Sequence, residues 1–328
     1  MWKYAALLVV IGVFSYYGKQ ITKTFTITEP DEYELVKKYL LNDSPLYGFN
    51  KPKIWIHTKY DLNSRKWHDF YSRSSYDLNQ PYIHLTIRSI INHCGEDFHI
   101  CLIDDETFSK LIPTWDIDLF HMAEPMKSQY RELGLAQLVY YYGGMVVPNS
   151  FLCTRNLKPM YDMGIEGDKP FVCEAINRTN INRLPFIPST YFLGARKNNI
   201  VVKQYIEYLR QRSMNGHITS VYEFLGETSI LAAKSIISEK MNLIGGEYIG
   251  IKTNKRRQVL VEDLMEDNYL DLNNNTYGIY IPEDEILRRP KYSWFAVLSV
   301  EQVLETNVFI TQHLKASMAL SLHKPVSI

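Results

Sequence analysis

Short apolar segments alternate with longer amphipathic segments through the first half of the chain. The short runs have the length and composition of buried strands, and the longer segments repeat their apolar residues at helical spacing. Residues Ile83, Ile87 and Ile90, for example, share one helical face. The predicted strands are 53–57, 98–103 and 145–147, and the predicted helices are 82–92 and 125–142. This alternation predicts an α/β layered fold with a mostly parallel sheet.

The second half of the chain is less regular and shows no internal repeat. We predict strands at 171–173, 191–193 and 278–281, and helices at 200–212 and 221–237. The glycine pair 245–246 predicts a loop, and the basic run 255–257 a solvated turn. A long polar and aromatic stretch over 58–80 predicts a loop, which at this length is typical of a functional or disordered segment.

The N-terminus carries an apolar run over residues 4–17, flanked by Lys3 and Lys19. As a helix it would span about 21 Å, less than the ~30 Å hydrocarbon core of a bilayer. No small-residue cleavage site follows, which favours an uncleaved signal-anchor over a cleaved signal or a docked helix. We therefore expect an anchor at 1–18, a stalk at 19–50 and one domain at 51–328. A single-pass protein of a secretory lumen, a bacterial envelope or a viral membrane would have this layout.

Charge and cysteine content exclude some classes of protein. Lysine plus arginine equals aspartate plus glutamate at 36 each, which argues against a nucleic-acid partner. None of the four cysteines forms a CxxC pair, so the sequence predicts no zinc site. The cysteines are expected to be small buried hydrophobes, with their disulfide state open. They are Cys94, Cys101, Cys153 and Cys173.

Several polar residues follow the predicted strands, where ligands bind in open α/β sheets. His57 ends the first strand close to Trp55, Asp104 follows the second, and Asn149 follows the third. We expect His57, Asp104 and Asn149 to open onto one crevice. Asp104 is equally suited to act as the N-cap of the next helix.

Four motifs occur in order over residues 51–155. They are Pro52-Lys53-Ile54-Trp55, Ile103-Asp104-Asp105-Glu106, Tyr142-Gly143-Gly144 and Leu152-Cys153-Thr154. Together they resemble the DXD-containing sugar-binding glycosyltransferases of the GT-A fold, especially the capsular polysaccharide synthesis type. The resemblance implies a GT-A-like (Rossmann-like) sheet, a nucleotide-sugar donor and a glycan acceptor. The candidate donor-binding residues, from the resemblance and from the strand ends together, are Trp55, His57, Arg131, Gly143, Gly144, Asn149 and Ser150.

The chain departs from this family where the family carries charge. Pro148 and Ser150 occupy the positions of the two metal-binding aspartates, and Arg131 and Leu135 those of a helical aspartate and arginine. Neutral oxygens hold a divalent cation poorly, so no strong manganese or magnesium site is expected. Basic residues such as Arg131, which grips phosphate bidentately, offer a metal-independent alternative. Arg131 is also compatible with a solvated helix face.

The sequence leaves the catalytic group and the activity open. Candidate catalytic carboxylates are Asp104, Asp105, Glu174 and Glu227, and Glu227 is equally suited to a surface position on its helix. One hypothesis is a transferase of sugars from a nucleotide-sugar donor to a glycan. The other is a catalytically inactive relative that binds carbohydrate or protein, because a fold does not determine function.

Overall fold

The structure, a computed structural model, describes residues 51–58, 80–179, 183–215 and 220–321. The expected anchor, the stalk and nearly all of the loop 58–80 lie outside the described residues. Within the described part of the chain, no helix has both the length and the apolar character needed to cross a bilayer.

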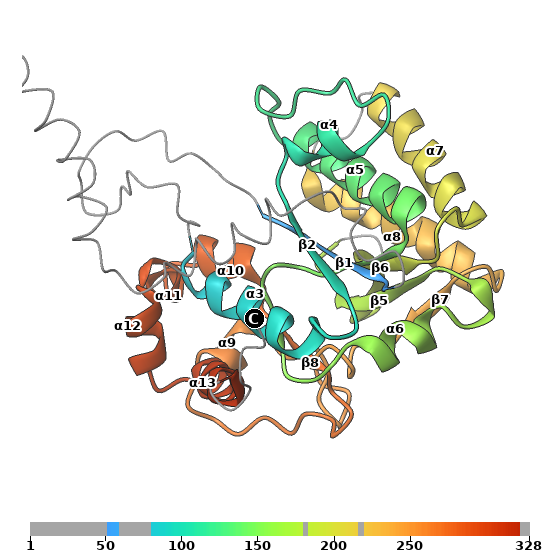
Figure 1. Ribbon diagram of the computed structural model, residues 1–328. Helices are drawn as coiled ribbons and strands as arrows, with labels where there is room; N and C mark the ends of the chain where they lie inside the picture. Colours follow the sequence, from blue (N-terminus) through green and yellow to red (C-terminus); the bar gives the residue numbers. More distant parts are fainter. Residues whose placement is uncertain (1–50, 59–79, 180–182, 216–219, 322–328) are drawn as a thin grey trace, which may run out of the picture.

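A mixed sheet forms the centre of the described domain (Figure 1). Its strand order is β2-β1-β3-β6-β5-β7, and only β6 runs antiparallel to the other strands. The strands are β1 Lys53–His57, β2 His99–Ile103, β3 Gly144–Val146, β5 Phe171–Ile176, β6 Phe186–Ala195 and β7 Asn242–Ile244. Because β1, β2, β3 and β5 are parallel, their carboxyl ends meet at one side of the sheet, called here the carboxyl edge.

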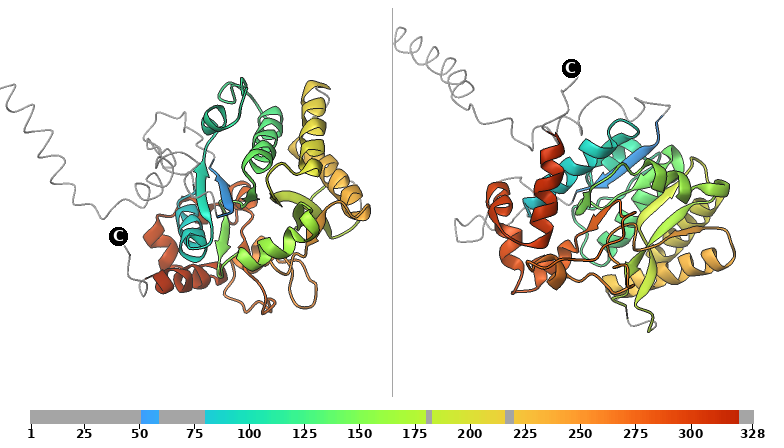
Figure 2. Two further views of the ribbon diagram at one scale, coloured as in Figure 1. Left: turned by 45° about the vertical axis from the view of Figure 1, so that its right-hand side comes forward. Right: turned by 90° about the horizontal axis from the view of Figure 1, so that it is seen from below.

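Helices cover both faces of this sheet (Figures 1 and 2). Alternate residues of β1 point to opposite faces, as in any strand: Trp55 joins one apolar cluster, and Ile54 and Ile56 join the other. The Trp55 side is covered by α4 Thr107–Leu111, α5 Met126–Tyr142, α7 Ile200–Asn215 and α8 Val221–Ile237. The opposite side is covered by α3 Tyr82–Cys94, α6 Lys158–Gly164 and part of the C-terminal region.

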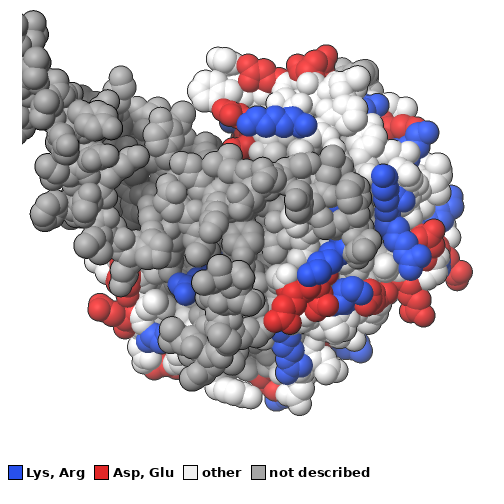
Figure 3. Space-filling model, viewed as in Figure 1, with Lys and Arg blue, Asp and Glu red and all other residues white. Residues whose placement is uncertain are grey.

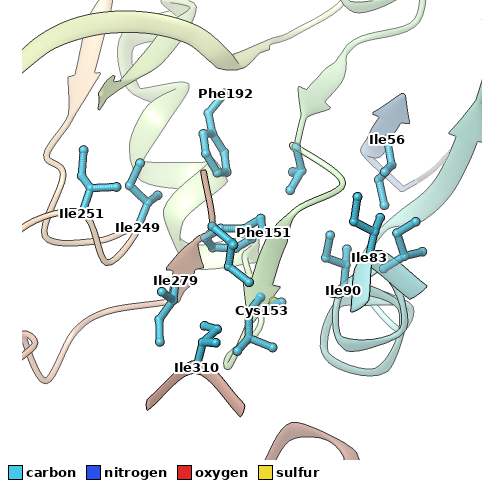
Figure 4. Packing of buried hydrophobic residues seen from close by; sticks show 14 of the residues in the cluster. Ile56, Ile83, Ile90, Phe151, Cys153, Phe192, Ile249, Ile251, Ile279 and Ile310 are labelled. Carbon is cyan, nitrogen blue, oxygen red and sulfur yellow. The ribbon is translucent and has the colours of Figure 1, made fainter. Parts of the chain in front are cut away.

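The C-terminal region consists of short helices packed beside α3, together with a two-stranded sheet. The antiparallel strands are β4 Phe151–Cys153 and β8 Gly278–Tyr280. The helices are α9 Val261–Leu264, α10 Glu283–Arg288, α11 Ser293–Val297, α12 Val300–Glu305 and α13 Phe309–Ser321. Figure 4 shows Phe151, Ile279 and Ile310 from these elements converging in one apolar core.

The structure confirms the mostly parallel α/β sheet and most of the predicted elements. β1 and α8 have the predicted bounds, and the other predicted strands and helices differ mainly at their ends. The strands β4 and β7 and the helices α6 and α9 to α13 were not predicted. The expectation that Asp104 is an N-cap is wrong by two positions, because α4 begins after Glu106. The Asp104 carboxylate nevertheless accepts a hydrogen bond from the Thr107 backbone N–H at 2.9 Å.

Two glycines join α5 to β3. Gly143 ends the helix with φ +71°, and Gly144 follows with φ +95°, in a region that favours glycine. A Cβ on Gly144 would lie 2.1 Å from the carbonyl oxygen of Lys53 in β1. The absence of a side chain at Gly144 therefore allows the two backbones to approach closely.

Replacing Gly144 by alanine tests this contact. We expect Gly144→Ala to destabilise the fold by about 3 kcal/mol or more, since the clash is with fixed backbone atoms. Gly167→Ala is the matched control: Gly167 also has positive φ, but its Cβ would meet nothing closer than 3.7 Å. The free energy of unfolding of this control should fall by only about 1–2 kcal/mol. Urea unfolding of both variants measures the difference, and equal losses would contradict the close-approach explanation.

Candidate functional site

Three charged or polar side chains meet at the carboxyl edge, and we call them the edge cluster: His57, Asp105 and Arg131. The Nε2 atom of His57 lies 2.9 Å from Oδ1 of Asp105. The Arg131 guanidinium donates from Nε to Oδ1 at 2.8 Å and from Nη2 to Oδ2 at 2.7 Å. Asp105 therefore accepts two hydrogen bonds from Arg131 of α5 and also contacts His57 at the end of β1.

The surrounding residues hold this cluster in place. The ring of His57 stacks on Phe108, with ring centroids 5.5 Å apart and planes 9° from parallel. Only 8% of the Arg131 side chain is exposed, and its Nη1 lies 3.7 Å from a carboxylate oxygen of Glu124. A solvated position for Arg131 is therefore wrong. Arg131 is instead a buried cation whose charge is balanced mainly by Asp105.

The environment fixes the charge of Asp105. Burial by itself raises the pKa of this carboxyl group, but the hydrogen bonds and charges of His57 and Arg131 outweigh it. The net result is a pKa well below the ordinary range, so Asp105 is ionised at neutral pH. An ionised carboxylate already engaged by an arginine is a weak proton acceptor, which argues for a positioning role.

A neighbouring carboxyl group, Glu132, was missed from the sequence. Its Oε1 accepts a hydrogen bond from the Tyr205 hydroxyl at 3.0 Å. Burial raises the pKa of Glu132, with the hydrogen bond from Tyr205 acting in the opposite direction. Perturbed carboxyl groups are common at functional sites. The available sequence signal was its place next to Arg131 on the predicted helix.

Hydrogen bonds to its backbone carbonyl groups hold the strand end at Pro148–Ser150 in place. The hydroxyl of Thr86 in α3 donates to the carbonyl oxygen of Asn149 at 2.5 Å. The backbone N–H of Ile281 donates to the carbonyl of Ser150 at 3.2 Å. Asn149 and Ser150 are both buried. Asn149 and Ser150 thus form part of the scaffold at the carboxyl edge.

The other predicted site residues lie in several environments. Trp55 is fully buried and donates from Nε1 to the carbonyl of Gly143 at 3.0 Å, so it offers no stacking surface to a ligand. Asp104 bonds locally to Thr107. Glu227 faces α7, where it pairs with Arg212. Of the predicted residues, the structure brings His57, Asp105 and Arg131 into direct contact, while Glu227 is engaged elsewhere.

A pocket opens at the same carboxyl edge. Its walls come from the end of β5, the first half of β6, the first turns of α8 and the segment 280–288. The side chains that give it chemical character are Arg178, Tyr191, Tyr222, Tyr280, Asp284 and Arg288. The rings of Tyr191 and Tyr280 lie 6.1 Å apart. The backbone hydrogen bond from the Ile281 N–H to the carbonyl of Ser150 joins this pocket to the strand end at Pro148–Ser150.

The donor atoms at the strand end do not fit a divalent cation. Asn149 and Ser150 supply neutral oxygens, and Pro148 has no ligand atom, whereas hard cations favour charged oxygens. Among the residues that the structure describes, no group of three or more histidine, cysteine, aspartate or glutamate side chains is placed to hold a metal ion.

On the surface shown in Figure 3, acidic and basic side chains are interspersed among the residues drawn in colour.

Comparison with known proteins gives only partial likenesses. No protein-family profile and no curated protein sequence matches the chain. The apo-form glycosyltransferase GlyE of Streptococcus pneumoniae TIGR4 is similar at 11% identity and TM-score 0.42, over 84% of this chain and 65% of GlyE. PaToxG glycosyltransferase matches at 12% identity and TM-score 0.33, over 58% of this chain and 74% of its own.

A galactosyltransferase, LgtC, solved in complex with donor and acceptor sugar analogs, is also similar. The identity is 11% and the TM-score 0.29, over 54% of this chain and 70% of LgtC. This chain covers just under two thirds of GlyE, so GlyE has regions without a counterpart here. At such low identities and scores, none of these likenesses defines an activity for this chain.

The ion pair of Asp105 predicts a pH-dependent loss of stability. We expect Asp105→Asn to lower the free energy of unfolding at pH 7 by about 3 kcal/mol, because it removes the main anionic partner of the buried Arg131. The folded-state pKa is depressed, so this contribution is present above the ordinary carboxyl pKa of about 4 and is lost as pH falls through the folded value. The gap between wild type and variant should therefore narrow at pH 3 in urea unfolding.

Asp118→Asn is the control for this measurement. Asp118 pairs with His121 at 2.7 Å, but both side chains are largely exposed. An exposed pair contributes little, so this substitution should leave the midpoint of urea unfolding nearly unchanged at pH 7. Equal losses from the two variants would show that the edge cluster does not stabilise the fold as described.

Proposed function

We propose that the chain is a glycosyltransferase-like protein that binds a nucleotide sugar at the carboxyl edge. It transfers the sugar to a glycan acceptor without a metal ion held at the strand end. The edge cluster and the tyrosine-lined pocket at the same edge are the observation that carries this proposal. Open α/β sheets bind their ligands at this edge.

The pocket has chemistry suited to a sugar. Tyrosine rings present an apolar face with a polar tip, which matches the C–H faces and hydroxyl groups of a pyranose. Asp284 and the two arginines add acceptors and donors for hydroxyl groups. The cavity holds about 80 Å³, which suits one part of a nucleotide sugar, such as its sugar ring, rather than the whole molecule.

Two arginines of the pocket are better suited to a diphosphate than Arg131. Arg131 is buried and already paired with Asp105. Arg288 donates to the Tyr222 hydroxyl at 3.0 Å, so its charge is not cancelled by that partner. Arg178 pairs with Glu285, from which an anionic ligand would have to displace it. The guanidinium fork binds phosphate oxygens bidentately, so Arg178 and Arg288 replace Arg131 as the proposed phosphate contacts.

The second candidate function is a carbohydrate- or protein-binding module without catalysis. The observation that favours it is the strand end, where Pro148, Asn149 and Ser150 bring no charged group. Turnover of a sugar nucleotide separates the two functions.

For both functions, we retain the proposal that residues 4–17 anchor the protein in a membrane of the secretory pathway, an envelope or a virus.

Calorimetry with a panel of sugar nucleotides tests the proposal directly. We expect the full chain to bind at least one donor equally well with and without manganese. Tyr222→Ala and Arg288→Gln should each weaken that binding about 5-fold or more, which corresponds to the loss of roughly 1 kcal/mol of contact energy. Both residues are exposed, so the substitutions should leave the fold intact.

Tyr269→Ala is the matched control, because Tyr269 is 89% exposed and lies outside the pocket lining. It should bind as the wild type does. Release of free nucleotide in the presence of a glycan then separates a transferase from a binding module. Manganese-dependent binding that the pocket variants leave unchanged would contradict the proposed site, and absence of binding to every donor would contradict the transferase function.

A further inference from the structure

We propose that Cys94 and Cys153 form a structural disulfide when the chain folds in an oxidising compartment. Their Sγ atoms lie 3.8 Å apart, and both side chains are fully buried. Cys94 is the last residue of α3, and Cys153 the last of β4. Figure 4 shows Cys153 within the apolar core between Phe151 and Ile310. The cross-link would join positions 59 residues apart in the chain.

Two hydrogen bonds hold α3 against the chain around β4, next to the two cysteines. The backbone N–H of Cys153 donates to the Ser89 hydroxyl at 2.8 Å, and Thr86 donates to the carbonyl of Asn149 at 2.5 Å. Both bonds join α3 to the chain that enters β4. A disulfide requires the sulfur atoms to approach to about 2.05 Å, so the remaining closure is less than about 2 Å.

The reaction is thiol–disulfide exchange with a small disulfide such as oxidised glutathione. One cysteine thiolate attacks a sulfur of that disulfide and releases one glutathione thiolate. The second cysteine thiolate then attacks the mixed disulfide, forming the Cys94–Cys153 bond and releasing the other glutathione. The two cysteines lose two protons and two electrons in total, and the glutathione disulfide is reduced to two thiols.

Burial determines when this exchange takes place. Burial raises the pKa of the Cys153 thiol, and the neighbouring Cys94 raises it further. Thiolates are the reactive form, so the folded, covered pair exchanges slowly. The bond therefore forms during folding, before α3 and the C-terminal helices cover β4. A chain that folds in a reducing compartment keeps both thiols.

The other two cysteines have no such neighbour. Cys101 lies in β2 on the opposite face of the sheet, with its Sγ 3.8 Å from the carbonyl of His99. Cys173 lies in β5. Both are buried, and burial raises the pKa of Cys101 to about 12. These two residues are expected to stay as thiols, which makes the predicted pairing unique.

The test is to count thiols in the full chain after folding in a glutathione redox buffer. Denatured protein treated with iodoacetamide should carry two alkyl groups, and four after prior reduction. Proteolysis without reduction should release one peptide pair joined through Cys94 and Cys153. The melting temperature should fall by roughly 5 °C or more on reduction, since a cross-link of this span restricts the unfolded chain.

Variants complete the test. Cys94→Ser and Cys153→Ser should each remove the effect of reductant on the melting temperature, whereas the control Cys101→Ser should keep it. Four alkylated cysteines in the oxidised wild type would overturn the proposal, as would a joined peptide pair containing Cys101 or Cys173. Because the wild-type mass and peptide map suffice, the proposal is tested even where a serine variant fails to fold.

Discussion

The close approach of the Gly144 backbone to Lys53 is the constraint on which the arrangement of the site depends. It places β3 beside β1 with no side chain between them. The chain that leaves β3 then reaches the carboxyl edge as Pro148–Ser150, and the helix that precedes it carries Arg131 over the end of β1. One pair of touching backbones thus positions both the charged and the neutral parts of the site.

Charge at the carboxyl edge is balanced inside the protein. Asp105 and Arg131 neutralise each other, and His57 completes the cluster. The strand end contributes only neutral groups, held by hydrogen bonds to α3 and to Ile281. Arg178 and Arg288, the arginines proposed to meet a ligand's negative charge, lie in the tyrosine-lined pocket, where Arg178 is paired with Glu285. One half of the carboxyl edge therefore has its charges paired within the protein, and the other half carries the side chains proposed to contact a ligand.

Local patterns were sufficient to predict the sheet and long helices such as α8, because their apolar spacing is strong. The sequence could not predict that Arg131 pairs with Asp105, since the two residues are 26 positions apart and meet only in the folded chain. The pocket was missed for the same reason: Tyr191, Tyr222 and Tyr280 come from three elements. Short helices such as α9 are stabilised by tertiary packing and carry too little periodicity to be recognised.

The antiparallel course of β6 has an evolutionary consequence. Because β5 and β6 are neighbours joined at the carboxyl edge, their connection borders the pocket without crossing the sheet. Its two ends are fastened together by the bond from the Asn177 N–H to the carbonyl of Pro185, at 3.0 Å. Insertions between these fastened ends leave the strand register intact. Ligand preference in descendants of this chain can therefore diversify through the length and composition of one hairpin, while the sheet is inherited unchanged.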